Sequence, residues 1–376
     1  MKGSLSARQG EPAAAGGPVD LKPAVAAPRS AALPAFDVAI TASDVAFGEL
    51  RRLLVAWRTH EPGARLGQDP EALHQLRVTA RRIDATLGLF KHHLPVALTT
   101  ARRTAKSVLR TLGAARDLDV QLAELARYCV ALPESERVAA EPLRVRLESE
   151  RTRARARMIR ALDSEPTRRW LETLTAASAA SPSSAAAFAE RAMLVMPERV
   201  RGRFRKLRKS VGRLHGSSPM EDYHLVRRRA KQLRYAIESG AVMFGKPAQD
   251  ALKALRRLQD ELGAHQDAYM ARKRLAALAA DPANGLPPGT LFLMGRLAER
   301  HATTTSQARK SLTRSWRKVR GRRWRALRSR LGELVEGARQ AGNAMSAEAV
   351  PAPTPVLAAG SSLQHAPEPE PYPLKH

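Results

Sequence analysis

The segment "HQLRVTARRIDATLGLF" at residues 74–90 places its apolar residues at helical spacing. On a helix each residue turns by roughly 100°, so positions three, four, seven and eleven apart share one side. One side then collects the apolar residues Leu76, Ile83, Leu87 and Phe90, and the opposite side collects His74, Arg77 and Arg81. The pattern predicts a helix with an apolar back, which packs on a core, and a cationic front.

Between the two terminal segments the chain is rich in Leu, Ala, Arg, Glu and Lys. This composition favours helices nearly throughout that region. Runs rich in Gly, Pro, Ser or Asn interrupt it at 60–70, 92–95, 131–136, 176–187, 215–222, 244–247 and 280–289. The segments between these breaks are long enough to pack antiparallel. We therefore predict an all-α fold of helical bundles. Residues 1–37 and 341–376 are rich in Ala and Pro, and we expect both to be disordered tails.

A second copy of the first segment, "HLVRRRAKQLRYAIESG", begins at His224, 150 residues after His74. The same offset pairs "LGAARD" at 112–117 with "LGAHQD" at 262–267. It holds without a gap from about residue 50 to residue 120, and a shared compositional bias would not keep one register. The chain therefore contains a tandem duplication of a helical unit.

The second copy repeats the division into back and front. Val226, Leu233 and Ile237 share one side, and the other carries His224, Arg227, Arg228 and Lys231, with Arg234 at its flank. Like charges one turn apart destabilise a helix, and the acidic residues Asp84 and Glu238 lie only at the edges of the two fronts. A single charged face is ordinarily a solvated surface. Two copies in register favour a binding surface.

Further cations precede each "LGA" motif: Arg102, Arg103, Lys106 and Arg110 in the first half, followed by Arg116, and Lys253, Arg256 and Arg257 in the second. Another basic set, Arg144, Arg151 and Arg155, alternates with Glu148 and Glu150, so we expect it to be a solvated face of mixed charge. Asp117, Asp119 and Asp267 are expected to cap helices or to brace the arginines.

The formal net charge is +28, and most of the excess lies between the two tails. A compact state of this charge repels itself unless a polyanion or counterions balance it. Nucleic acid, an anionic membrane surface and inorganic polyanions are the candidate partners. Arginine donates two parallel hydrogen bonds to a phosphate, and histidine adds a charge that depends on pH.

Several other classes of protein are disfavoured. Cys129 is the only cysteine, which argues against a disulfide framework and a thiolate metal cluster and fits a reducing cytoplasm. No apolar run approaches the roughly 18 residues of a membrane span, and the prolines of the N-terminal segment interrupt any signal-like apolar core. There is no P-loop and no "HExxH" motif, so we expect neither catalysis nor a cofactor or metal.

The two His/Arg segments and the two "LGA" motifs resemble those of the CHAD family, the conserved histidine α-helical domain. The resemblance covers about residues 38–340 and implies two four-helix bundles, at about 38–178 and 185–340, related by pseudo-twofold symmetry. It also implies that their basic faces line a shared groove or pore that binds inorganic polyphosphate, and that the protein associates with polyphosphate granules. The site residues that follow are His74, Arg77, Arg81, Arg82, Arg103, Lys106, Arg110 and Arg116, with His224, Arg227, Arg228, Lys231, Arg234, Lys253, Arg256 and Arg257.

Two positions depart from this symmetry. Asp84 occupies the position that matches Arg234, and Gln266 the position that matches Arg116. We expect the second half to contribute more affinity at the first of these positions, and Arg116 to act from one half only.

Nucleic-acid binding is the alternative function. Aromatic residues make up 4% of the chain, and Tyr235 is almost the only one near the basic faces, so there is little on which bases could stack. No helix-turn-helix or zinc-finger spacing is present, which leaves non-specific binding open as a secondary activity. The segment "SWRKVRGRRWRALRSR" at 315–330 could extend the polyanion surface or touch a membrane or granule. Inward packing of Trp316 and Trp324 is the simpler interpretation.

Overall fold

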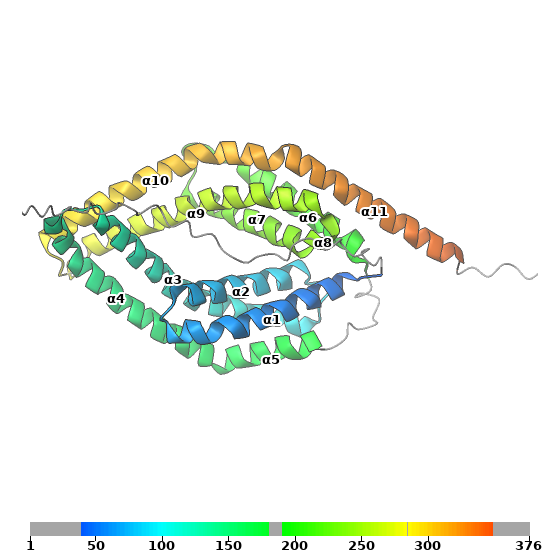
Figure 1. Ribbon diagram of the computed structural model, residues 1–376, viewed down its shortest axis with the longest axis horizontal. Coiled ribbons are helices and arrows are strands. Elements are labelled where there is room, and N and C mark those ends of the chain that lie inside the picture. The colour runs from blue at the N-terminus through cyan, green and yellow to red at the C-terminus, as the bar shows by residue number, and fades with distance from the viewer. Residues whose placement is uncertain (1–38, 180–189, 284, 349–376) are drawn as a thin grey trace, which may run out of the picture. The chain divides into compact units, whose positions relative to one another are not determined.

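The computed structural model describes residues 39–179, 190–283 and 285–348, and within these ranges every regular element is a helix. The predicted N-terminal tail lies outside the described residues. The first half of the chain consists of α1 (Ala42–Leu66), α2 (Pro70–Leu89), α3 (Val96–Val130), α4 (Glu134–Asp163) and α5 (Glu165–Ala179), shown in Figure 1. The second half consists of α6 (Ala192–Val211), α7 (Met220–Ser239), α8 (Ala241–Phe244), α9 (Lys246–Ala280), α10 (Pro288–Arg320) and α11 (Arg322–Glu348).

The duplication recurs in the helix boundaries. The helices α2 and α7 have 20 residues each, and α3 and α9 have 35 residues each. Within each pair, both ends keep the offset found in the sequence. The repeated unit is therefore a set of helices in one register, as the sequence predicts. The pseudo-twofold relation between the halves stays a prediction.

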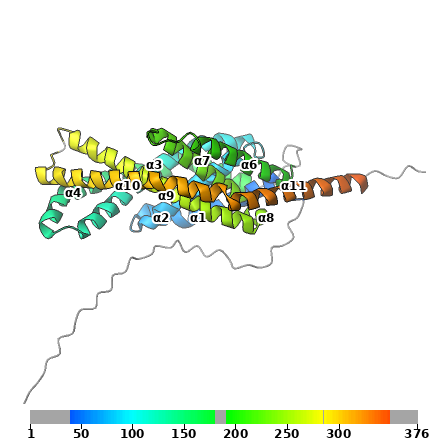
Figure 2. The same ribbon diagram turned by 90° about the horizontal axis from the view of Figure 1, so that it is seen from above.

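The last helix of each half is interrupted. A break at Ser164 separates α4 from α5, and a break at Gly321 separates α10 from α11. In both views α10 and α11 follow each other end to end (Figure 1, Figure 2). Over the described residues, each half thus has three long helices and a fourth that is divided in two, with the short α8 as an addition in the second half. The predicted start of the C-terminal tail at residue 341 is wrong, because α11 continues to Glu348.

Local signals place the start of α2. Gly67, at φ 75°, ends α1 in the left-handed conformation, in which glycine has no Cβ to strain. Asp69 then caps α2, where its carboxylate accepts a hydrogen bond from the Glu71 amide at 2.8 Å, and Pro70 occupies the first turn. These residues determine where His74 and the front of α2 begin.

The apolar backs of α2 and α7 lie in the cores of their halves, as predicted. In α2, Leu76, Ile83 and Leu87 are fully buried, and in α7 Val226, Leu233 and Ile237 are buried. The core of the first half also contains Trp57 and Trp170, whose rings meet edge to face at 5.4 Å. Burial of each of these side chains contributes about 1.5–3 kcal/mol to the free energy of folding. Because the apolar side of each helix is held in the core, the opposite fronts point away from it.

The halves contact each other through equivalent residues. Thr41 and Arg191, which match across the repeat, form an isolated antiparallel bridge. The Ala42 amide donates to the Glu190 carbonyl at 2.8 Å, and the Ala192 amide donates to the Ile40 carbonyl at 2.9 Å. Contacts of α1 with α6 and of α2 with α7 extend this junction. The two fronts therefore face a common region.

Candidate anion-binding site

Two cations from each front come together where α2 meets α7. We call these four residues, Arg77, Arg81, Arg227 and Lys231, the central cluster. Burial, together with the charges of Arg81, Arg227 and Arg77, lowers the pKa of Lys231 to about 6. Arg81 and Lys231 are repeat partners, as are Arg77 and Arg227. The cluster thus combines equivalent positions of the two halves.

Two exposed carboxylates face the arginines of the cluster. Asp117 lies 3.9 Å from Arg77, and Asp267 lies 3.9 Å from Arg227. The arginine side chains are only 23% and 20% exposed, and the Nε atom of each is buried without a hydrogen-bond partner within the described residues. Ion pairs of this length leave most guanidinium donors available. The bracing role expected for these aspartates is confirmed, and both lie inside helices rather than at caps.

The glycines of the "LGA" motifs lie beside these same guanidinium groups. A Cβ atom on Gly113 would lie 3.7 Å from Arg77 Nε, and one on Gly263 would lie 3.6 Å from Arg227 Nη2. The motifs therefore place a flat stretch of α3 or α9 against an arginine of the neighbouring helix. The same arrangement recurs in both halves.

The fronts carry more negative charge than the sequence suggests. Glu238 accepts a hydrogen bond from Arg82 of the other half at 3.1 Å, and its carboxylate also lies 3.7 Å from Arg234 and 3.9 Å from Arg256. One carboxylate thus offsets part of the charge of three predicted site residues. Arg81 and Lys231 make no ion pair in the described part of the chain. Among the half-buried cations of the two fronts that the structure describes, Arg81 and Lys231 are thus the ones that no carboxylate pairs with.

The two asymmetric positions have distinct local partners. Asp84 accepts a hydrogen bond from Arg102 Nε at 2.7 Å, so its charge is balanced within the first half. Gln266 accepts from Arg227 Nη1 at 3.1 Å, whereas Arg116 donates to the Pro70 carbonyl at 3.2 Å. Gln266, which stands where the first half has Arg116, can therefore accept a hydrogen bond from Arg227, whereas an arginine at this position could not.

The two histidines occupy different surroundings. His74 is half-buried, and its pKa is lowered by burial and by the charges of Arg116, Arg77 and Arg81, against the opposing effect of Glu71. His224 is exposed on α7. The repeat places both residues on the fronts, and His74 adjoins the central cluster, since Arg77 and Arg81 are among its electrostatic neighbours.

The remaining predicted cations are exposed on α7 and on α3 and α9, which pack against the helices of the two fronts. They are Arg103, Lys106 and Arg110 on α3, Arg228 on α7, and Lys253, Arg256 and Arg257 on α9. Among the described residues, only Arg256 of this group has an ion-pair partner. They supply a polar rim rather than half-buried charge.

Sequence reasoning missed Arg203. This residue of α6 donates to the Gln232 carbonyl at 3.4 Å, and its pKa is lowered to about 10 by burial and by the charges of Arg199 and Arg102. Its repeat partner is Leu53, an apolar core residue, so the duplication gave no reason to select it. Arg203 adds a further half-buried cation near the junction.

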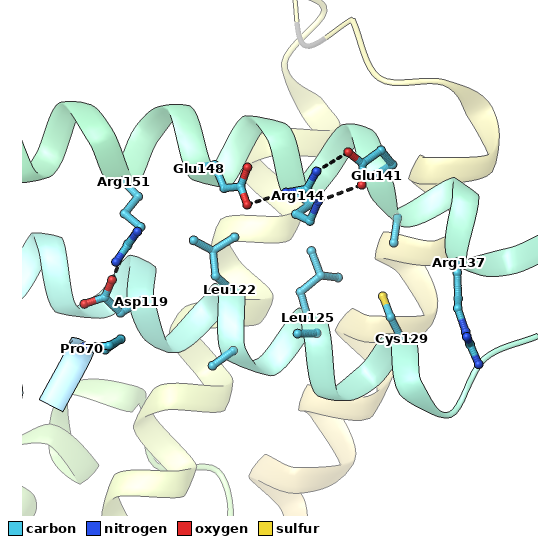
Figure 3. A pocket seen from close by; sticks show the side chains of 13 residues that line it. Pro70, Asp119, Leu122, Leu125, Cys129, Arg137, Glu141, Arg144, Glu148 and Arg151 are labelled. Carbon is cyan, nitrogen blue, oxygen red and sulfur yellow. Dashed lines mark hydrogen bonds and ion pairs between the residues drawn. The ribbon is translucent and has the colours of Figure 1, made fainter. Parts of the chain in front are cut away.

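A separate hollow of about 500 Å³ lies between α3 and α4 (Figure 3). Leu122 and Leu125 form its apolar side, and Arg144 is held by Glu141 and Glu148. Arg151 donates to Asp119 at 2.6 Å. Arg144 and Arg151 are therefore paired with carboxylates, as expected for the mixed face, whereas Arg137, which also lines the hollow, donates to the Leu132 carbonyl at 2.8 Å.

Within the described residues, no helix is long and apolar enough to span a bilayer. In the same ranges, no group of three or more His, Cys, Asp or Glu residues is placed to hold a metal ion.

Comparison with known proteins gives one family. The family model described as "CHAD domain" matches residues 49–276. Among solved structures, PptA from Streptomyces chartreusis is similar, with a TM-score of 0.59, 23% identity, and coverage of 74% of this chain and 100% of that one. The CHAD domain from the plant Ricinus communis has a TM-score of 0.54, 23% identity, and coverage of 82% and 97%. No curated protein sequence matches. The chain belongs to the CHAD domain family.

Proposed function

We propose that this chain binds inorganic polyphosphate, without catalysis, through the central cluster and the exposed cations around it. The observation that carries the proposal is the meeting of half-buried cations from α2 and α7 with too few carboxylates to balance them. The CHAD family is associated with polyphosphate binding.

A chain of phosphates suits this charge distribution. Each repeating unit carries a negative charge, and arginine can donate two parallel hydrogen bonds to its oxygens. Because Arg77 and Arg227 are largely buried, salt screens their interaction with a ligand less than it screens a surface charge. Binding would also relieve the repulsion within the cluster. We infer that the ligand runs along the groove or pore predicted between the two fronts.

Single-stranded nucleic acid fits less well. Tyr235 is 8% exposed, and the guanidinium of Arg234 lies 5.0 Å from its ring centroid. The ring is therefore covered on the side of the cationic front and offers bases no stacking surface. Duplex DNA needs no such surface, so it is the competitor against which polyphosphate should be tested.

Binding to polyphosphate would direct the protein to polyphosphate granules in the cell. A tagged full-length chain should colocalise with granules in phosphate-rich cells. A chain that lacks the charges of the central cluster should disperse.

The direct test replaces Arg81, Arg227 and Lys231 with glutamine, which removes two guanidinium charges and an amine that bound phosphate would protonate, and keeps polar side chains of similar reach. A matched control replaces Arg153, Arg157 and Arg160 of α4, which are exposed and unpaired within the described residues. We expect the site variant to lose at least about tenfold in affinity and its salt slope to fall by about 2 to 3. The control should bind nearly as the unmodified protein does.

Competition supplies the second readout. Polyphosphate and duplex DNA should be compared at matched phosphate concentration and salt. We expect polyphosphate to displace DNA, and the site variant to lose that preference. Equal losses in the site variant and the α4 control would overturn the assignment of the site.

A further inference from the structure

A second cationic region lies on α6, α10 and α11. The sequence contains no Asp or Glu between Glu198 and Glu221, or between Glu299 and Glu333. These two acid-free segments contact each other, since α6 packs against α11. A Cβ on Gly332 would meet Arg201 at 3.7 Å, while Arg309 donates to the Gly216 carbonyl at 3.3 Å, so the segments run antiparallel.

Three aromatic rings join the segments. Phe204 of α6 stacks on Trp324 of α11 with ring centroids 3.6 Å apart, and lies 5.9 Å from the ring of Trp316 of α10. All three are buried, which confirms the inward packing expected for the tryptophans. Because the rings point inward, residues on the other sides of these helix turns are left at the surface.

We call the cations around this stack the outer surface. It is represented by Arg208 and Lys209 of α6, Arg317 and Arg320 of α10, and Arg325 and Arg328 of α11. All six are exposed, and none makes an ion pair within the described residues. Mixed-sign pairing, which marks the face of α4, occurs here at the edges of the acid-free segments, where Arg201 pairs with Glu198 and Arg330 with Glu333, and the six cations of the outer surface take no part in it within the described residues.

The outer surface is separated from the central cluster by the core of the second half. Val226 and Leu233 of α7 enter that core on the side opposite Arg227 and Lys231. From α6, Phe204 enters it toward the tryptophans. A ligand in the central cluster therefore leaves the outer surface free to contact another one.

We propose that the outer surface binds a second segment of polyphosphate, so that one molecule can hold two chains together. This inference rests on the proposed function of the central cluster. Five of the six cations are arginines, which recognise phosphate by paired hydrogen bonds. The aromatic rings are unavailable to stack bases or enter a membrane. Charge complementarity thus favours a polymer of phosphate that carries no bases.

The test uses the full chain with Arg317, Arg320, Arg325 and Arg328 replaced by glutamine. Exposed Arg153, Arg157, Arg160 and Arg168 on α4 and α5 give a control with the same change in charge. Calorimetry with short polyphosphate should find two bound chains per unmodified molecule and one per outer variant. Light scattering with long polyphosphate should show cross-linked particles for the unmodified protein and the control, and a loss of them for the outer variant.

Variants of the central cluster separate the two proposals. Replacement of Arg81, Arg227 and Lys231 should remove the other bound chain and leave the outer one. If that variant keeps both chains, the proposed function of the central cluster fails. If the outer variant keeps the stoichiometry and cross-linking of the unmodified protein, the outer surface does not bind polyphosphate. Loss of duplex DNA binding alone would assign it to nucleic acid and overturn the proposal.

Discussion

Replacing Lys231 with arginine should remove a proton uptake that accompanies polyphosphate binding. Burial and the charges of Arg81, Arg227, Arg77 and Arg234 lower the pKa of this ammonium group to about 6. At pH 8 about one hundredth of the free molecules then carry a proton on Lys231. Phosphates placed against the cluster favour the charged form and raise this pKa.

The size of the proton uptake follows from the difference between the pKa of Lys231 in the free and in the bound protein. If the pKa of bound Lys231 rises above about 9, each molecule takes up nearly one proton on binding at pH 8. Affinity should then fall by up to about tenfold for each unit of rising pH while the bound lysine stays protonated. Arginine keeps its charge over this range, so the variant should bind without this dependence.

Calorimetry at pH 8 in buffers of differing ionisation heat measures the uptake directly. This pH suits the test because His74, with its lowered pKa, is neutral and terminal phosphates are already ionised. Lys253→Arg, on the exposed rim, is the matched control and should keep the uptake of the unmodified protein. Equal proton uptake in the Lys231 variant and the unmodified protein would refute the reasoning.

Three further outcomes are expected. Replacing Asp117 and Asp267 with asparagine should tighten polyphosphate binding several-fold in a competition titration, because each carboxylate lies 3.9 Å from an arginine that phosphate would contact; weaker binding would contradict this. Trp324→Ala should lower the free energy of unfolding by about 3 kcal/mol or more in a denaturant titration, since a buried ring stacked on Phe204 is lost, whereas Trp324→Phe should keep most of the stability. NMR titration of His74, assigned with His74→Gln, should give a pKa below 6.5 that rises when polyphosphate is added, and a value above 6.5 in the free protein would be inconsistent with its surroundings.

The fold could be predicted because its signals are local and repeated. Apolar residues such as Leu76 and Ile83 recur at helical spacing, and the same spacing returns at Val226 and Leu233. The constant offset of 150 residues between the two sets then indicates that both halves contain the same helical unit. The sequence did not predict that α11 extends to Glu348, because the composition typical of the tail begins before the helix ends.

Details of the site depend on tertiary packing, which the repeat does not encode. Arg82 and Glu238 belong to different halves, and only the contact of α2 with α7 brings them together. Arg203 corresponds to the apolar Leu53 at the 150-residue offset, so the repeat gave no reason to expect a functional cation there. His74 and His224 share a motif but differ in exposure, and Arg116, whose charge lowers the pKa of His74, has the neutral Gln266 as its counterpart.

The exchange of backbone hydrogen bonds between Ala42 and Glu190, and between Ala192 and Ile40, is the kind of contact that two identical subunits make when they form a dimer. Here both partners belong to one polypeptide, so their encounter is intramolecular and does not weaken on dilution. A recognition site assembled from two copies is thereby retained at the lowest expression levels. Each copy can also differ from the other at a single position, as Arg81 and Lys231 illustrate.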